Sequence, residues 1–233
     1  MDGYLLVDKP AGISSFAVVA RVRRVLSEAA GHKVKVGHTG TLDPAATGLM
    51  ILVIGAYCKR ASEFSKLDKT YQVEMTLGAV SSTGDIEGEI IKKSVHRPDE
   101  TEVRLILSKF KGQIFQTPPA FSAIKVNGQR AYKLAREGKE VKIEPRQVTI
   151  KSIKNIDYKY PKLSLITEVS SGTYIRSLVE DIGAELGTGA YMSGLCRTKI
   201  ADHTLTDAVE LEGLTKDIIY RNILPNYVRG SQS

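Results

Sequence analysis

Residues 69–78 carry the pattern that most constrains how this chain folds. Apolar and polar side chains alternate strictly through the segment, and the apolar set is Tyr71, Val73, Met75 and Leu77. Successive side chains of a β-strand point to opposite faces of its sheet, so this spacing predicts a strand with one face in the core. The chain therefore builds at least one sheet that must be covered on one side.

Two helices are predicted from a different period. Between residues 173 and 186 the apolar side chains follow a spacing of three and four, which is typical of an amphipathic helix: Ile175, Leu178, Val179, Ile182 and Leu186. A second helix is predicted over 16–29, after the candidate N-caps Ser14 and Ser15. Arg21, Arg23 and Arg24 fall largely on its outer face.

Shorter patterns predict the other elements. They are strands at 3–9, 49–54 and in three runs between 141 and 167, helices at 98–110 and 130–136, an extended segment at 113–125, and two short helices after Thr206. Strands and helices are mixed without regular βαβ alternation, which favours an α+β fold. We expect one catalytic domain over 1–224 and a polar tail over 225–233.

Composition excludes several classes of protein. Hydrophobic residues make up 42% of the chain and charged residues 25%, as in ordinary globular proteins. The longest apolar stretch, residues 48–57, is shorter than the ~20 residues that span a bilayer. The N-terminus lacks the pattern of a secretory signal, so we expect a cytoplasmic protein without a membrane span. Cys58 and Cys196 are far apart in the sequence, which indicates neither a zinc site nor a disulfide framework.

The positive charge is concentrated in one segment. Residues 125–162 hold eleven Lys or Arg and four acids, which equals the whole formal net charge of +7. Clustered cations bind polyanions better than the same charge spread over a surface. The segment therefore favours a nucleic acid partner over a merely solvated face.

No cofactor or metal motif is present in the sequence. The chain lacks a P-loop and a G-x-G-x-x-G fingerprint, and its four histidines have no partner at i+4. Asp85 begins a segment that starts like a calcium loop, but the ligand spacing does not continue. If the chain is an enzyme, we expect it to use ordinary side chains.

The loop at 37–48, GHTGTLDPAATG, is the best candidate for chemistry. Its single acid, Asp43, lies among small residues that allow a flat ligand to approach the backbone. Two interpretations remain open, because Asp43 followed by Pro44 is also the pattern of a helix N-cap with proline at the first helical position. His38 is similarly either a loop hydrogen-bonding residue or part of a site.

This loop resembles the central motif of the TruB-type tRNA pseudouridine synthases. Further blocks resemble the family in the same order between residue 3 and about residue 215. They are LVDKPAGISS at 6–15, KTY at 69–71, QTPPAFSAIK at 116–125, GTYIRSL at 172–178 and LCRT at 195–198.

The resemblance implies a fold and a reaction. The fold is the pseudouridine synthase fold, a mixed, largely antiparallel sheet with helices and loops around a central RNA-binding cleft. The reaction is the isomerisation of the uridine at position 55 in the T loop of tRNA, without metal, cofactor or energy source. The family breaks the N-glycosidic bond, rotates the base and rejoins it through carbon, and Asp43 is implied as the nucleophile at either ribose C1′ or uracil C6. The target base is flipped into the site.

The resemblance also implies roles for residues outside the loop. Tyr71 would stack on the uracil and take its C5 proton, although its alternation with Val73 also suits a core tyrosine. Arg176 would pair with Asp43 and keep it ionised, and its alternative is an exposed pair with Glu180.

The remaining implied residues bind substrate. His38 would hold the flipped-out base, and Tyr174 and Leu195 would complete the uracil pocket. An RNA-gripping insertion is implied at 122–142. The expected RNA contacts are Lys9, Lys125, Arg130, Lys133 and Arg136.

Two departures from the family pattern are visible. Many bacterial relatives carry a C-terminal PUA domain that grips the acceptor stem, and we expect none here after about residue 224. The family's Leu-Arg-Arg is Leu195-Cys196-Arg197 in this chain. We expect a monomer that binds the T stem-loop of tRNA and has no protein partner. The rival hypotheses are a non-catalytic RNA-binding or tRNA-folding module and a synthase that acts on another RNA, alone or within a guide-RNA complex.

Overall fold

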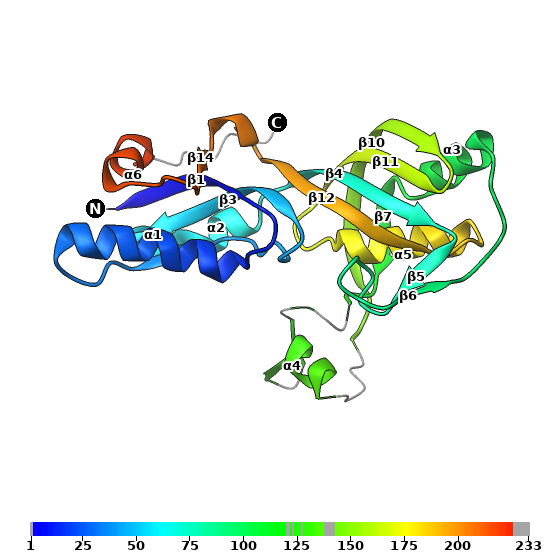
Figure 1. Cartoon of the computed structure of the whole chain (residues 1–233), viewed down its shortest axis with the longest axis horizontal. Coiled ribbons are helices and arrows are strands. Elements are labelled where there is room, and N and C mark those ends of the chain that lie inside the picture. The colour runs from blue at the N-terminus through cyan, green and yellow to red at the C-terminus, as the bar shows by residue number, and fades with distance from the viewer. Residues whose placement is uncertain (1, 120–121, 123, 127, 138–142, 226–233) are drawn as a thin grey trace. The chain divides into compact units, whose positions relative to one another are not determined.

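The computed structural model describes residues 2–119, 122, 124–126, 128–137 and 143–225. The chain forms two compact units (Figure 1). Unit 1 combines Met1–Lys69 with Cys196–Ser233, and unit 2 is Thr70–Leu195. Each unit contains strands and helices of its own, and the predicted α+β class is confirmed.

The sheet of unit 1 is built on two long antiparallel strands. β1 (Gly3–Lys9) pairs with β3 (Thr47–Ile54) along its whole length, from Gly3 opposite Ile54 to Lys9 opposite Gly48. The short β14 (Val209–Glu210) runs parallel to β1, and β2 (Val36–His38) runs antiparallel to β3. The last residues of β12 (Ala190–Ile200) pair in parallel with the start of β3 and extend to β13 (His203–Thr204).

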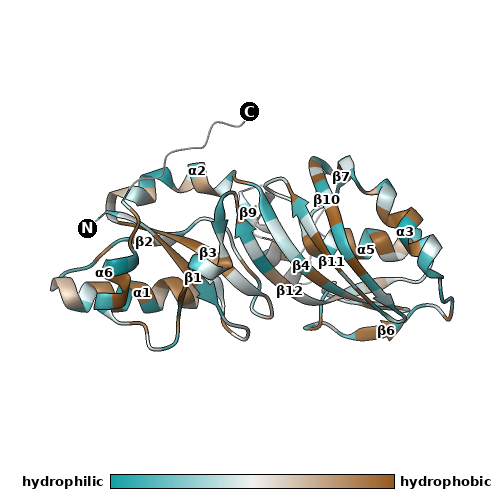
Figure 2. Ribbon diagram, turned by 90° about the horizontal axis from the view of Figure 1, so that it is seen from above, coloured by the Kyte–Doolittle hydropathy of each residue, from teal (hydrophilic) through white to brown (hydrophobic). Residues whose placement is uncertain are grey.

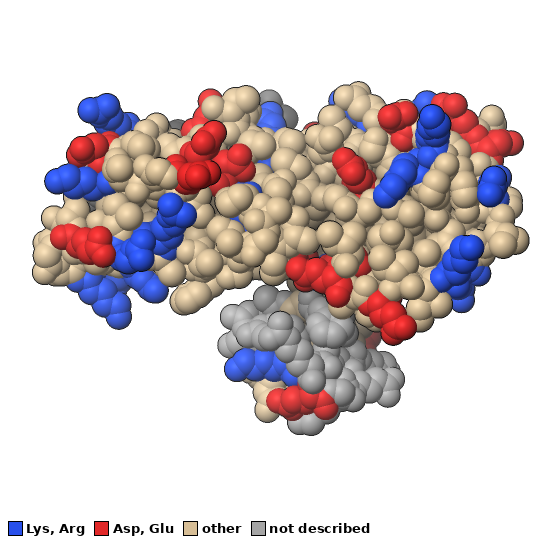
Figure 3. All heavy atoms as spheres, in the orientation of Figure 1, with Lys and Arg blue, Asp and Glu red and all other residues tan. Residues whose placement is uncertain are grey.

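The helices of unit 1 begin and end where the sequence provides caps. α1 (Ser15–Ala30) begins after Ser14, whose hydroxyl accepts from Ala17 N at 3.1 Å, and ends at Gly31 in a left-handed conformation. Arg21 and Arg24 are exposed on α1, where Lys and Arg side chains gather on the face shown in Figure 3. The other helical segments are η1 (Gly55–Arg60), α2 (Ala61–Ser65), η2 (Leu205–Asp207) and α6 (Lys216–Asn222).

The core of unit 1 is formed by β1, β3 and the elements packed on them. Alternate side chains of the two strands meet Phe64 of α2, and Tyr4 lies 5.0 Å from the Phe64 ring centroid. β3 is apolar almost throughout, as the brown ribbon in Figure 2 shows, and all but its first residue are buried. A strand buried on both faces reads as a continuous apolar run, which is why 49–54 could be identified from sequence.

The sheet of unit 2 has the strand order β12, β4 (Lys69–Leu77), β11 (Lys162–Val169), β10 (Arg146–Lys159) and β7 (Gly112–Gln116). β4 has the predicted alternation, with Tyr71, Val73, Met75 and Leu77 buried. The covering helices are α3 (Glu100–Lys109) and α5 (Ile175–Glu185). Two hairpins complete the unit, β5 (Ala79–Ser81) with β6 (Ile90–Lys92) and β8 (Lys125–Val126) with β9 (Gln129–Arg130), and α4 (Ala131–Arg136) follows β9.

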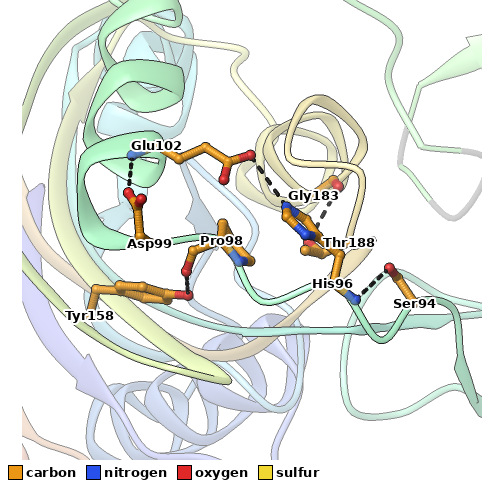
Figure 4. Close-up of polar contacts among 8 residues, drawn as sticks. All are labelled: Ser94, His96, Pro98, Asp99, Glu102, Tyr158, Gly183 and Thr188. Carbon is orange, nitrogen blue, oxygen red and sulfur yellow. Dashed lines mark hydrogen bonds and ion pairs between the residues drawn. The ribbon is translucent and has the colours of Figure 1, made fainter.

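A small polar network sets the start of α3 (Figure 4). Asp99 accepts from Glu102 N at 2.8 Å and is the N-cap, while Tyr158 Oη donates to Pro98 O at 2.6 Å. His96 Nε2 lies 3.4 Å from Oε1 of Glu102, which is in the first turn of α3. The helix predicted at 98–110 therefore begins two residues later, at Glu100. The carbonyl of Pro98 accepts a hydrogen bond from Tyr158 of β10, and Asp99 is the N-cap.

One expectation about elements was wrong, one strand was missed, and one open alternative is excluded. The three strands predicted between 141 and 167 are two long strands, β10 and β11, whose pairing shifts register twice. β12 was not predicted, because polar residues and Gly194 interrupt its apolar pattern. No helix begins at Asp43: the chain makes a turn there, with Ala46 N donating to Asp43 O at 3.1 Å, so the N-cap interpretation of Asp43-Pro44 is excluded. Within the described residues, no helix has both the length and the apolar character needed to cross a membrane.

Candidate active site

The predicted site residues are divided between the two units. His38, Asp43 and Lys9 belong to unit 1, whereas Tyr71, Tyr174, Arg176 and Leu195 belong to unit 2. Each group has its own set of supporting contacts. The predicted pairing of Asp43 with Arg176 links one group to the other and stays a prediction.

Asp43 lies half-buried on the loop between β2 and β3. The residue before it, Leu42, is fixed by Ser15 at the start of α1. The Ser15 hydroxyl accepts from Leu42 N at 2.8 Å and donates to Leu42 O at 2.8 Å. Both residues are buried, at 3% exposure each. One hydroxyl thus satisfies both backbone groups of the residue next to the acid.

Lys9 holds the backbone that follows Asp43. Its side chain is 0% exposed, and its ammonium donates to Pro44 O at 3.1 Å and to Ala46 O at 2.5 Å. Gly12 N also donates to Pro44 O, at 2.9 Å. The predicted contact of Lys9 with RNA stays a prediction; in this structure the side chain is enclosed and directed at backbone carbonyls. Lys9 shapes the loop that carries the acid.

His38 ends β2, at the start of the same loop. Its Nδ1 is buried without a hydrogen-bond partner among the described residues. Burial, and next the charge of Arg197, lower the pKa of His38 below its usual value, so the imidazole is neutral at pH 7. A neutral ring with an unpaired buried nitrogen can still make a hydrogen bond with a ligand.

Arg197 was not selected as a site residue from the sequence, yet it contacts this loop at both ends. Its guanidinium is 1% exposed and donates from Nε to Leu49 O at 2.7 Å and from Nη2 to Gly40 O at 3.1 Å. Arg197 lies in the block LCRT at 195–198, which was identified from the sequence. The inward direction of the side chain is set by the pairing of Arg197 with Gly48, which sequence alone does not show.

In unit 2, Arg176 lies in the first turn of α5 and is buried rather than exposed. Its Nη1 donates to Thr83 O at 3.0 Å and lies 3.6 Å from Asp85 Oδ2, and the two side chains are 7% and 4% exposed. The alternative of an exposed surface pair with Glu180 is thereby excluded. Asp85 is itself held, since its Oδ1 accepts from Thr83 Oγ1 at 2.6 Å and from Glu87 N at 3.0 Å. A carboxylate this close favours the charged guanidinium and limits its orientations.

Sequence reasoning missed Asp85 as a partner of Arg176. The segment that begins at Asp85 was compared with a calcium loop. Nothing in its pattern indicates that the carboxylate pairs with an arginine about ninety residues later. Across the described residues, no three His, Cys, Asp or Glu side chains gather in a way that could hold a metal ion.

Tyr174 is held in place by Gln116. The Gln116 side chain, 1% exposed, donates to Tyr174 O at 3.0 Å and accepts from Tyr174 N at 2.7 Å. Arg146 places its guanidinium carbon 5.1 Å from the centre of the Tyr174 ring, within the range of a cation–π contact. The ring is half-buried, as is Leu195 on β12. Tyr71 is 8% exposed on β4, in the position that its alternation predicted.

The basic insertion is described in part. Lys125 and Arg130 are paired backbone positions in the hairpin of β8 and β9, and Lys133 is exposed on α4. Arg136 is the last residue of α4. Residues 123, 127 and 138–142 of the predicted insertion lie outside the described residues.

Comparison with known families decides the classification. Residues 23–175 match the family described as TruB family pseudouridylate synthase (N terminal domain), and residues 176–229 match the tRNA pseudouridylate synthase B C-terminal domain. The chain belongs to the TruB family. The relationship that the motifs indicated is confirmed.

Individual relatives of this TruB-family chain support the same classification. It is 42% identical to tRNA pseudouridine synthase B of Aquifex aeolicus (strain VF5) over 214 residues, which are 91% of this chain and 73% of that protein. It is 40% identical to tRNA pseudouridine synthase B of Endomicrobium trichonymphae over 227 residues, which are 97% of this chain and 96% of that protein.

Solved structures confirm the pseudouridine synthase fold for this TruB-family chain. A chain of the Cbf5-Nop10-Gar1 complex matches with a TM-score of 0.72 and 24% identity over 96% of this chain. A chain of an H/ACA RNP bound to a substrate RNA containing 2′-deoxyuridine matches with a TM-score of 0.67 and 24% identity over 91%. The match spans 60% and 52% of those two longer chains.

Proposed function

We propose that this chain is a tRNA pseudouridine synthase that isomerises the uridine at position 55 of the T loop, with Asp43 as its nucleophile. The observation that carries the proposal is the fixed placement of Asp43 in a TruB-family chain. Ser15 holds the residue before the acid, and Lys9 holds the residues after it. Relatives at about 40% identity bear the name tRNA pseudouridine synthase B.

The reaction is an isomerisation, so no atom or electron is gained overall. The bond between C1′ and N1 of uridine breaks, the uracil rotates, and a bond between C1′ and C5 forms. C5 loses its proton and N1 gains one. A carboxylate nucleophile at C1′ or C6 divides this change into two easier steps, and both routes remain open.

Asp43 must be ionised and correctly placed to attack. The loop contacts supply placement, because the backbone groups on both sides of the acid are held by buried side chains. Arg176 is proposed as the cation that pairs with Asp43, and its hydrogen bond to Thr83 O and ion pair with Asp85 keep the guanidinium oriented in unit 2. His38, neutral at pH 7, is proposed to hydrogen-bond the flipped nucleotide.

Tyr71, Tyr174 and Leu195 are proposed to form the uracil pocket. Tyr71 offers a ring on the otherwise apolar face of β4, and Gln116 fixes the backbone of Tyr174. Tyr71 is the candidate acceptor of the C5 proton. A buried aromatic surface of this kind favours a base that has left its stack.

Lys125, Arg130, Lys133 and Arg136 are proposed to contact phosphates of the T stem-loop. Such contacts fix the position of an RNA without reading its sequence. We propose that the protein acts in the cytoplasm as a monomer without a protein partner, and sedimentation of the purified chain with and without tRNA checks that stoichiometry.

The proposal is tested with unmodified tRNA transcripts. The purified protein is incubated with tRNA without ATP or added metal, and pseudouridine is mapped by chemical probing. We expect modification at position 55 with the wild type, and none with Asp43→Asn, which keeps the shape of the side chain and removes its charge. A transcript with cytidine at position 55 controls for other sites.

Each rival has its own signature in that experiment. Equal absence of pseudouridine with wild type and Asp43→Asn, while both bind the tRNA, would support a non-catalytic RNA-binding module. Modification of a different RNA, or only after a guide RNA is added, would support a synthase with another substrate. Either result overturns the assignment to position 55.

A further inference from the structure

Arg197 is a fully buried cation for which the described structure provides no acid. Its side chain is 1% exposed. Within the described part of the chain its hydrogen bonds go to the two carbonyls of Leu49 and Gly40, and no carboxylate lies within 4.0 Å of it. Burying an unpaired charge is costly, so packing alone does not account for an arginine here where an apolar side chain would be cheaper.

The two carbonyls that Arg197 joins lie at the two ends of the loop that carries Asp43. Gly40 precedes the acid by three residues, and Leu49 follows it by six on β3. The Nε–O distance to Leu49 is 2.7 Å and the Nη2–O distance to Gly40 is 3.1 Å. A planar guanidinium has donors in a fixed fork, so it sets the separation and the direction of both carbonyls together.

The glycines around Arg197 show how closely the loop is held against it. Gly48 has φ +104°, and a Cβ there would lie 2.4 Å from Arg197 O. A Cβ on Gly40 would lie 3.4 Å from Arg197 Nη1. The backbone of Arg197 also pairs in parallel with Gly48. The residue thus holds the loop through its backbone on one side and its side chain at both ends.

The charge of Arg197 also reaches the neighbouring titratable groups of unit 1. After burial, it is the second cause that lowers the pKa of His38. It is also the second cause, again after burial, that lowers the pKa of Lys69 to about 8. Removing the charge should therefore raise the pKa of His38, which gives a measurement independent of folding stability.

We propose that Arg197 is a positioning residue for the reaction, which ties the two ends of the Asp43 loop through its buried guanidinium and so holds the acid in the attacking position. This inference rests on the proposed function. Lysine cannot replace it, because one ammonium on a flexible stem does not fix two carbonyls in the geometry of a planar fork.

The test compares Arg197→Lys, which keeps the charge, with Arg197→Met, which removes it. For both we expect kcat on unmodified tRNA to fall about 10- to 100-fold, since small displacements of reacting groups have effects of this size. The Kd for tRNA should change less than about threefold, because a buried residue makes no phosphate contact. In Arg197→Met, an NMR titration should show a higher pKa for His38 than in the wild type.

Lys69→Met is the matched control. Lys69 is also a buried cation in unit 1, and its ammonium donates to Ser65 O and Leu67 O, outside the Asp43 loop. Its kcat should fall much less than that of either Arg197 variant. A kcat within about twofold of the wild type in folded Arg197→Lys and Arg197→Met would overturn the inference, as would a fall equalled by Lys69→Met.

Failures of folding and of the proposed function are distinguishable from failure of the inference. If Arg197→Met does not fold, Arg197→Lys decides by the same two measurements, the fall in kcat and the change in the Kd for tRNA. If neither folds, Arg197 is a structural residue and the inference is overturned. An active wild type with unaffected variants refutes only the inference, whereas an inactive wild type refutes the proposed function and the role of Arg197 with it.

Discussion

The hydroxyl of Ser15 bonds both backbone groups of Leu42, with N–O and O–O distances of 2.8 Å each. This pair connects the first residue of α1 to the residue before Asp43. The helix therefore supports the acid as well as the core of unit 1.

Ser15→Ala is expected to reduce both stability and kcat. The substitution leaves a buried N–H and a buried carbonyl of Leu42 without their partner, at a cost of ~1–3 kcal/mol. Thermal unfolding and single-turnover kinetics measure the two effects. Ser14→Ala is the control, because it removes the N-cap of α1 at a cost of about 1 kcal/mol but does not touch Leu42. Loss of activity in both variants would show that α1 stability, and not the bond to Leu42, supports the acid.

Asp85→Asn is expected to destabilise the chain by about 3 kcal/mol. It removes the carboxylate 3.6 Å from Arg176, and breaking a buried ion pair from one side leaves the other charge poorly compensated. Denaturant unfolding measures the change. Glu100→Gln, which breaks the exposed pair with Arg104, should cost less than about 1 kcal/mol. Equal effects of the two substitutions would mean that the buried pair contributes no more than a surface one.

Much of the framework of the chain could be predicted from its sequence, because periodicity reports burial. The alternation on β4 and the spacing on α5 follow from which side chains face a core. β12 was not predicted, because its own apolar pattern is irregular and its strand conformation depends on pairing with neighbouring strands. The loop at 37–48 was identified, yet its Asp-Pro pair is compatible with a helix start. The conformation of that loop depends on the long-range contacts of Ser15, Lys9 and Arg197. Such contacts join residues far apart in the sequence and cannot be predicted from the local pattern.

Stability should rise between about pH 8 and pH 10 through Lys69. Burial, followed by the charge of Arg197, lowers the pKa of Lys69 from its usual value of 10.5 to about 8 in the folded chain. The unfolded state therefore binds more protons in this range, and deprotonation of Lys69 as the pH rises favours the folded state by up to about 3 kcal/mol. The difference in unfolding free energy between wild type and Lys69→Met should grow by this amount in favour of the wild type. A pH-independent difference would contradict the assignment.

Gly48→Ala is expected to be far more damaging than Gly31→Ala. Both glycines have positive φ, so both substitutions strain the backbone by ~1–2 kcal/mol. At Gly31 nothing lies within 4 Å of the added Cβ, whereas at Gly48 the Cβ would meet Arg197 O at 2.4 Å. Soluble yield and melting temperature report the difference. Similar melting temperatures would show that β3 and β12 can separate at this point without cost.

The double substitution Arg130→Glu with Lys133→Glu is expected to weaken tRNA binding and flatten its dependence on salt. Each phosphate contact that is lost removes a released counterion, so the slope of log K against log salt becomes less steep by about one unit per contact. Arg104→Glu, on the exposed face of α3, is the control. An unchanged salt slope would remove the hairpin and α4 from the RNA interface.

The central claim is that Asp43 attacks the substrate, and release of the C5 hydrogen tests it most directly. tRNA labelled with tritium at C5 of uridine loses one tritium for each pseudouridine formed, and single-turnover release is measured for wild type and Asp43→Asn with tRNA binding measured in parallel. We predict stoichiometric release with the wild type and none with Asp43→Asn, at comparable tRNA affinity. Equal release with the two proteins would contradict the claim that Asp43 is the nucleophile.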